Sequence, residues 1–183
     1  PKENFKWVNP VHEILMSADG VPPPTQFTNE EVRMIHKRAE LAKVADPMRN
    51  LRIIKSYVEE SEKEDPRQLY YLGQEYSGVG DVENAIKTYA RYVEITGWDD
   101  EKCLALIKLS ELNVQKADFA SAVSWATKAV TTKENWCETY FALAKVYYYW
   151  ALSEKDGGNK RRHFEKCVMF CKVGLSMPPT KTA

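Results

Sequence analysis

Over the last two thirds of the chain, apolar residues recur at the spacing of helices that each bury one face. Leu69 and Leu72 are three residues apart, and Gly73 and Tyr76 extend the same stripe. Because an α-helix has 3.6 residues per turn, residues three or four apart lie on one side of it. Gly80 then allows a tight turn, after which the helical spacing resumes. The pattern predicts two antiparallel helices that pack as a hairpin.

This hairpin pattern occurs three times. The first copy has packing or turn residues at Leu69, Leu72, Gly73, Tyr76, Gly80, Ala85 and Tyr89. The second copy has matching residues at Leu106, Leu109, Ser110, Asp118, Ala122, Ala126 and Ala129. The third has Tyr140, Leu143, Ala144, Tyr147, Cys167, Cys171 and Gly174. These positions are similar to those of the 34-residue tetratricopeptide repeat, which implies a mainly α fold of stacked antiparallel hairpins at 66–99, 103–136 and 137–179.

The third copy is longer than the other two. The segment from Leu143 to Cys167 is eleven residues longer than the equivalent segment from Leu109 to Ala122 in the second copy. We therefore expect the first helix of the third hairpin to continue to about Ser153, roughly one turn beyond its usual end.

The second helix of the third hairpin should then begin near Lys160 and carry basic residues at its tip. Lys160, Arg161 and Arg162 lie beside Trp150 in this prediction, and His163 is expected to be exposed. Such a tip suits contact with an acidic partner, a phosphate-bearing acceptor or a second subunit. An ordinary solvated loop is the alternative.

The start of the chain has a different pattern. Phe5 and Trp7 alternate with Lys6 and Val8, which predicts a short β-containing segment. Three consecutive prolines at 22–24 exclude a helix there, because proline holds the preceding residue in an extended conformation.

The sequence also predicts where the helical repeat domain begins. Residues 28–45 are compatible both with a helix that starts at a capping box and with a strand. The helical spacing is clearer over 47–62. We therefore divide the chain into an N-terminal arm, 1–45, and a helical repeat domain, 46–183.

Composition narrows the classes of function. The chain has 26 Lys and Arg against 26 Asp and Glu, so no net charge draws it to nucleic acid or to an anionic membrane. No apolar run reaches the roughly 18 residues that span a bilayer.

Four cysteines without a Cys-x-x-Cys pair predict reduced thiols in a cytoplasmic protein. Cys167 and Cys171 are four apart, but both fall at packing positions, so we interpret them as core thiols rather than zinc ligands.

The first helices of the three repeats carry the candidate binding residues. In such arrays these helices line a groove, and here they combine aromatic rings with Lys and Arg, which suits a peptide, a sugar face or a base. The predicted groove residues are Arg67, Tyr70, Tyr71, Gln74, Leu104, Lys108, Glu111, Phe141, Lys145, Tyr148 and Tyr149. Packing of these rings against a neighbouring domain is the alternative interpretation.

The chain also resembles the C-terminal region of bacterial and phage family-2 glycosyltransferases of the GT-A fold that carry tetratricopeptide tails. The resemblance rests on WVNPVHEIL and on DPMRNLRIIKSYVEESEKEDPRQLYYLGQEYSGVGDVENAIKTYARYVEITGWDDE. It implies that His12 ligates a divalent metal, Mn or Mg, which holds the nucleotide sugar in the parent enzyme. The family's Asp-x-Asp motif and catalytic Asp have no counterpart here. This chain is therefore expected to be a longer protein's C-terminal fragment, inactive alone and without a cofactor of its own.

Three hypotheses about function result. In the first, the repeats bind their own catalytic domain, a protein, glycan or other acceptor, or a second copy in a homo-oligomer. In the second, the chain is a free-standing adaptor that binds a peptide or protein in its groove. A nucleic-acid binder is the third and weakest, because it rests on Lys160, Arg161 and Arg162 against a net charge of zero.

Overall fold

A computed structural model describes residues 5–11, 14–17 and 46–178 of the chain. These residues form two short strands and seven helices. The chain divides into two compact units, residues 1–61 and residues 62–183, and each is considered by itself. In the described residues, no helix is both long and apolar enough to cross a membrane.

The first unit contains the β-containing segment that the alternating pattern predicts. β1 (Phe5–Val8) and β2 (Ile14–Ser17) pair in antiparallel register, with Phe5 opposite Ser17 and Val8 opposite Ile14. Asn9, directly after β1, has a φ of 75°, a left-handed conformation that asparagine adopts more readily than most residues.

One helix completes the described part of the first unit. α1 (Arg49–Glu60) begins two residues later than predicted and buries Leu51 and Ile54. The predicted metal ligand His12 and the helix-or-strand alternative for residues 28–45 lie outside the described residues.

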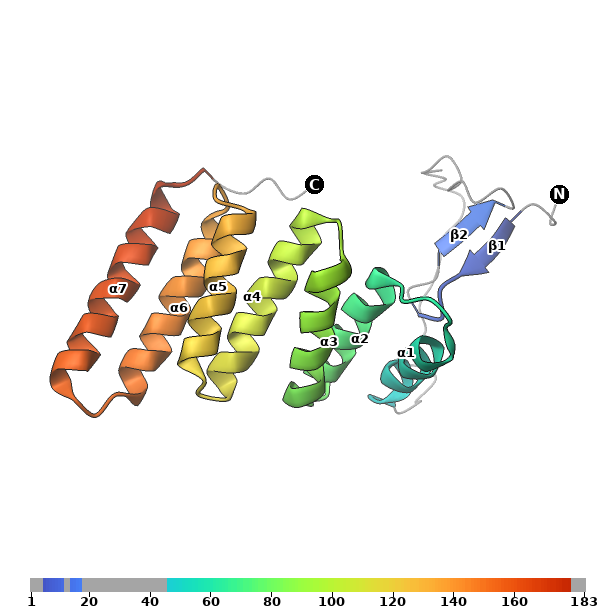
Figure 1. Cartoon of the computed structure of the whole chain (residues 1–183), viewed down its shortest axis with the longest axis horizontal. Helices are drawn as coiled ribbons and strands as arrows, with labels where there is room; N and C mark the ends of the chain where they lie inside the picture. The colour runs from blue at the N-terminus through green and yellow to red at the C-terminus, as the bar shows by residue number, and fades with distance from the viewer. Residues whose placement is uncertain (1–4, 12–13, 18–45, 179–183) are drawn as a thin grey trace, which may run out of the picture. The chain divides into compact units, whose positions relative to one another are not determined.

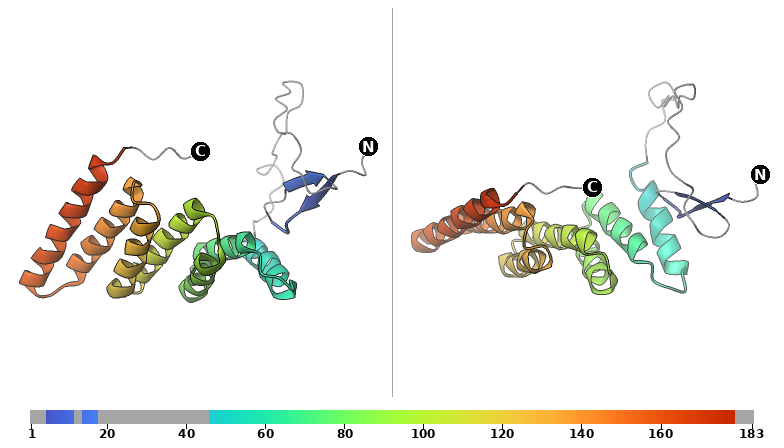
Figure 2. Two further views of the ribbon diagram at one scale, coloured as in Figure 1. Left: turned by 45° about the horizontal axis from the view of Figure 1, so that its top comes forward. Right: turned by 90° about the horizontal axis from the view of Figure 1, so that it is seen from above.

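The second unit is an array of three antiparallel helical hairpins, which confirms the tetratricopeptide-like fold. Its helices are α2 (Pro66–Gly78), α3 (Val82–Ile95), α4 (Asp99–Gln115), α5 (Phe119–Thr132), α6 (Cys137–Ser153) and α7 (Gly157–Ser176). Each helix packs against the next one in the chain, and α4 also packs against α6 (Figure 1). Seen from above, α2, α4 and α6 lie in one layer, with α3 and α5 in the other (Figure 2).

The hairpins close through turn and capping residues and close helix contacts, some of which the sequence pattern identifies. A Cβ atom on Gly73 would lie 2.9 Å from the ring of Tyr89, so a side chain there would push the two helices apart. Gly80 has a φ of 80° in the turn between α2 and α3. Ala117 occupies the equivalent turn position of the second hairpin and has a φ of 56°, although alanine adopts this conformation reluctantly. An aspartate caps the second helix of each hairpin: Asp81, Asp118 and Asp156.

The third hairpin is extended as its longer spacing predicts. α4 ends at Gln115, six residues after Leu109, whereas α6 ends at Ser153, ten residues after the equivalent Leu143. α6 therefore continues about one turn beyond the position where the repeat normally turns.

Two predicted helix starts are wrong. α7 begins at Gly157 rather than near Lys160, because the side chain of Asp156 accepts a hydrogen bond from the Asn159 backbone N–H and caps the helix. Gly157 and Gly158 thus form the first turn of α7. α4 begins at Asp99, four residues before Cys103, where acidic residues in the first turn favour a helix N-terminus.

Candidate functional site

Part of the predicted groove converges between α4 and α6. Glu111 on α4 accepts a hydrogen bond from Lys108 Nζ at 2.9 Å and another from Lys145 Nζ, on α6, at 2.8 Å. The second contact joins two adjacent hairpins. Beside it lies a hollow lined by Glu111, Val114, Gln115, Lys145 and Tyr149. We refer to these five residues and Lys108 as the central hollow.

The central hollow combines one acidic and two basic groups. Burial alone would raise the pKa of Glu111, but the hydrogen bonds from Lys145 and Lys108 outweigh it and hold this pKa below its usual value. Glu111 is therefore ionised at neutral pH. Each lysine ammonium has three donors, and about half of each lysine side chain is exposed. The two lysines can therefore donate further hydrogen bonds to an incoming acceptor.

The predicted residues on α2 divide between surface and core. Arg67 donates a hydrogen bond to the Tyr71 hydroxyl at 2.8 Å, and its guanidinium lies 5.3 Å from the centre of that ring. Tyr70 is half-buried, and its ring centre lies 5.8 Å from that of Tyr89 and 5.2 Å from that of Tyr92. Burial, with a contribution from the nearby Glu101 charge, raises the pKa of Tyr70. Tyr70 therefore packs the first hairpin, and the exposed Gln74 is its neighbour on the surface.

Two aromatic residues of α6 turn away from the central hollow toward α7. The Phe141 ring lies over Gly174, where an added Cβ would come within 2.8 Å of it. The Tyr148 ring lies edge-on to Phe164 of α7, with ring centres 6.1 Å apart. Leu104 on α4 is exposed. The predicted groove residues thus lie on at least two surfaces rather than one.

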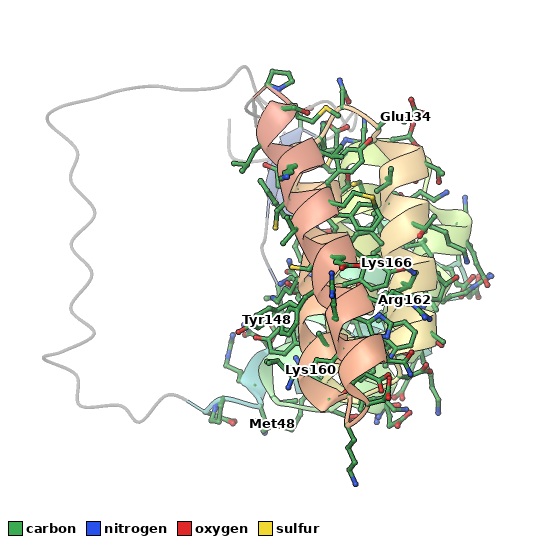
Figure 3. All side chains as sticks on the ribbon, turned by 90° about the vertical axis from the view of Figure 1, so that its left-hand side faces the viewer. Met48, Glu134, Tyr148, Lys160, Arg162 and Lys166 are labelled. Carbon is green, nitrogen blue, oxygen red and sulfur yellow. The ribbon has the colours of Figure 1, made fainter. Side chains whose placement is uncertain are left out.

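The basic residues at the start of α7 are less available for a partner than predicted. Arg161 donates a hydrogen bond to Glu165 at 2.9 Å, and Lys160 is partly buried. Arg162 is exposed and projects to the side of α7 opposite Tyr148 (Figure 3).

The expectation that His163 is exposed is wrong. Its ring stacks on Trp150, with centres 4.3 Å apart, and only 9% of its surface is exposed. Trp150 also stacks on Phe119 at 5.6 Å, so it is a packing residue of the extended hairpin. His163 Nε2 lies 3.6 Å from a carboxylate oxygen of Glu154. The extra turns of α6 and α7 cover this histidine, which its sequence position beside three basic residues did not indicate.

A further hollow between α3, α4 and α5 did not emerge from the sequence. It is lined by Ala90, Val93, Glu94, Lys102, Leu106, Trp125, Lys128, Thr131 and Thr132. Lys128 Nζ lies 4.1 Å from the centre of the Trp125 ring. The three-residue spacing of this cation–π pair is the signal that could have indicated it.

The cysteines are separate thiols within the described residues. Cys103 is buried, its Sγ lies 3.7 Å from the carbonyl oxygen of Ala129, and burial raises its pKa to about 12. Burial and the neighbouring Cys171 raise the pKa of Cys167. Among residues 5–11, 14–17 and 46–178, no three His, Cys, Asp or Glu side chains are grouped to hold a metal ion.

Comparison with known proteins finds a similarity in structure but none in sequence families. No protein-family model and no curated protein matches it. Among solved structures, the chain is similar to the crystal structure of MamA, with 14% sequence identity and a TM-score of 0.45. The similarity covers 68% of this chain and 88% of that one.

Proposed function

We propose that the chain is a protein-binding module and that the central hollow holds a peptide segment of a partner. The observation that carries the proposal is the meeting of Lys108, Glu111 and Lys145 from adjacent hairpins beside an open hollow with an exposed tyrosine, Tyr149. Such a constellation offers charge, hydrogen bonds and ring surface, which are the groups that recognise peptides.

The chemistry of the hollow favours an acidic segment with an apolar neighbour. A carboxylate of the partner would take donors from Lys108 and Lys145, whose shared partner Glu111 uses one donor from each. An apolar or aromatic side chain next to it would pack on the Tyr149 ring. Glu111 holds the two ammonium groups in place. Its negative charge also weakens the binding of anions that have no apolar group to pack on Tyr149.

Selection from a random peptide library displayed on phage, with the whole chain as bait, tests this proposal. We expect enriched peptides to contain Asp or Glu beside an apolar residue. Lys145→Ala and Tyr149→Ala should each weaken binding of an enriched peptide about tenfold in calorimetry. Lys87→Ala, an exposed lysine on α3, is the matched control and should bind like the wild type. Enriched peptides that bind all four proteins equally would show that the hollow is not the site.

We propose as a second candidate that the module belongs to a nucleotide-sugar-dependent glycosyltransferase. The support is the sequence resemblance alone, in particular the run at 7–15 and the Gly97-Trp98-Asp99 segment after the first repeat. In that protein His12 would ligate the divalent metal that holds the nucleotide sugar, and the repeats would bind the acceptor or the catalytic domain.

The gene sequence upstream of Pro1 tests this second candidate. A GT-A domain with an acidic metal motif in the same reading frame is the expected result. The full-length protein should then transfer sugar from one member of a panel of nucleotide sugars, which mass spectrometry of the product would detect. A start codon directly before Pro1 would refute the candidate and leave the protein-binding module unaffected.

A further inference from the structure

The helix α7 carries an apolar stripe that the described helices cover only in part. Phe164, Val168, Cys171 and Leu175 succeed one another at spacings of four, three and four residues, so they share one side of α7. Val168 is 52% exposed and Leu175 is 77% exposed, while the other two are partly buried. Figure 3 looks directly onto this end of the array. We call these four residues the end stripe.

The end stripe repeats the residues by which the preceding hairpin holds its neighbour. When Cys167 is aligned with Ala122, the end stripe corresponds to Phe119, Val123, Ala126 and Val130 on α5. Ala126 belongs to the core cluster that includes Leu143 and Val146 of α6, and the other three pack against that cluster. α5 thus uses these positions to bind the next hairpin, and α7 presents the same positions with no further hairpin among the described residues to cover them.

The neighbouring helix α6 contributes to the same surface in the same way. Its exposed Phe141 and Tyr148 occupy the repeat positions of Ile107 and Val114 on α4, which pack against the same core cluster. A terminal repeat usually ends in a polar outer face, because nothing covers it. This end of the array instead keeps the composition of an internal stacking interface.

We propose that a second copy of the chain covers the end stripe, with the two α7 helices antiparallel about a two-fold axis. In a two-fold interface, a residue of one copy that contacts a second residue of the other copy is matched by the reverse contact. The stripe must therefore complement itself. The register is centred along α7 at the height between residues 169 and 170, although neither of these side chains belongs to the stripe. Phe164 then lies opposite Leu175 of the second copy, and Val168 lies opposite its Cys171. The four stripe residues then form four apolar layers with no polar residue among them.

The charges beside the stripe favour this antiparallel pairing. Glu165 and Lys172 each directly follow a stripe residue and lie seven residues apart, so they flank the stripe on one edge. Antiparallel helices bring such edge positions together, which places Glu165 of each copy near Lys172 of the other. Glu165 is 62% exposed and keeps free acceptor sites beside its hydrogen bond from Arg161. A hollow lined by Gly157, Lys160, Arg161, Phe164, Glu165 and Val168 leaves room for the opposing Leu175.

Sedimentation of the whole chain over a concentration series tests the proposal. We expect a monomer–dimer equilibrium in which nearly all of the chain is dimeric at about 0.1 mM protein. Leu175→Glu should abolish the dimer without unfolding the chain, because Leu175 is largely exposed. Met169→Glu, on another side of the same helix, is the matched control and should dimerise like the wild type. A monomer at every concentration would overturn the proposal, as would a dimer that survives Leu175→Glu.

A charge exchange distinguishes the antiparallel pairing of two α7 helices from any other dimer. Glu165→Lys and Lys172→Glu should each weaken the dimer about tenfold, because each places like charges opposite one another. The double variant should restore the wild-type dissociation constant, since it exchanges the two charges across the axis. Additive losses in the double variant would overturn the antiparallel arrangement.

Crosslinking gives a third readout with the native residues. The two Cys171 side chains lie in adjacent layers next to the proposed axis, so a short bismaleimide should join two copies. Cys171→Ser should remove this product, and Leu175→Glu should reduce it to the level of a monomeric control. Crosslinking that persists through Cys137 after Cys171→Ser would point to another face and overturn the arrangement.

Discussion

The second and third hairpins of the array use the same residue positions in different surroundings. Val123 on α5 packs against the core cluster that joins the second hairpin to α6, whereas Val168, its equivalent on α7, is more than half exposed. The residue type and its place on the helix are the same. The difference shows that the repeat pattern specifies a stacking surface at every hairpin and that its burial depends on the next hairpin in the array.

The two hairpins also differ at their turns. α5 has 14 residues and begins directly after a short turn in which Ala117 is left-handed. α7 has 20 residues and begins at the Asp156 cap beyond the extended α6. The extra turns bury His163 against Trp150 and bring Glu154 close to it. The third hairpin is therefore modified at its tip and keeps its packing positions at its base.

The largest expected difference between the two hairpins concerns an added charge at equivalent positions. Val123→Asp should lower the free energy of unfolding by about 3 kcal/mol, because it places a carboxylate against the core cluster. Val168→Asp should change the unfolding free energy of the dilute chain by less than about 0.5 kcal/mol. Urea denaturation followed by circular dichroism measures both. Equal destabilisation by the two variants would mean that α7 is covered within a single chain.

A second comparison concerns two glycines against aromatic rings. Gly73 lies beside Tyr89, which is only 1% exposed and therefore has little room to shift, so Gly73→Ala should destabilise the array by about 1 kcal/mol despite a better helix propensity. Gly174 lies beside the exposed Phe141 ring, which can rotate away. Gly174→Ala should therefore stabilise α7 by about 0.5 kcal/mol. Thermal melting of both variants decides whether the two shifts have opposite signs.

A third prediction concerns the ion pair that joins the two hairpins. The hydrogen bonds from both lysines hold the pKa of Glu111 below its usual 4.5, so its stabilisation is present above about pH 4.5 and disappears as the pH falls through the lowered folded-state pKa. Glu111→Gln should cost about 0.5 kcal/mol at neutral pH and nothing near pH 2. Urea midpoints of wild type and variant across this range provide the measurement. Glu59→Gln, whose carboxylate pairs with Lys55 within one helix, is the control with the smaller neutral-pH effect. A constant difference at all pH values would contradict the assignment.

The smallest effect leaves stability unchanged and concerns thiol reactivity. Cys103 and Cys137 occupy equivalent repeat positions, but Cys103 is buried with a pKa of about 12, whereas Cys137 is partly exposed. At about pH 8, Cys103 should react with a maleimide at least a hundredfold more slowly than Cys137, because the thiolate is the reactive form. Mass spectrometry of timed samples measures both rates, and denaturant should equalise them. Similar native rates would show that α4 opens readily.

Local patterns in the sequence predict the hairpins well, for a physical reason. The spacing of Leu106 and Leu109 and the glycine at position 80 act over a few residues, so they depend only on one helix or one turn. The longer segment between Leu143 and Cys167 likewise predicts the extended hairpin, because helix length depends on residue count.

Contacts between distant residues are what only the tertiary structure decided. Glu111 meets Lys145 because adjacent hairpins stack with their first helices side by side, and nothing in either helix alone indicates this pair. His163 comes after three basic residues and yet is buried, because α6 continues far enough to place Trp150 against it. Amphipathic spacing determines which side of a helix is apolar, and only the position of the neighbouring helix determines whether that side is covered.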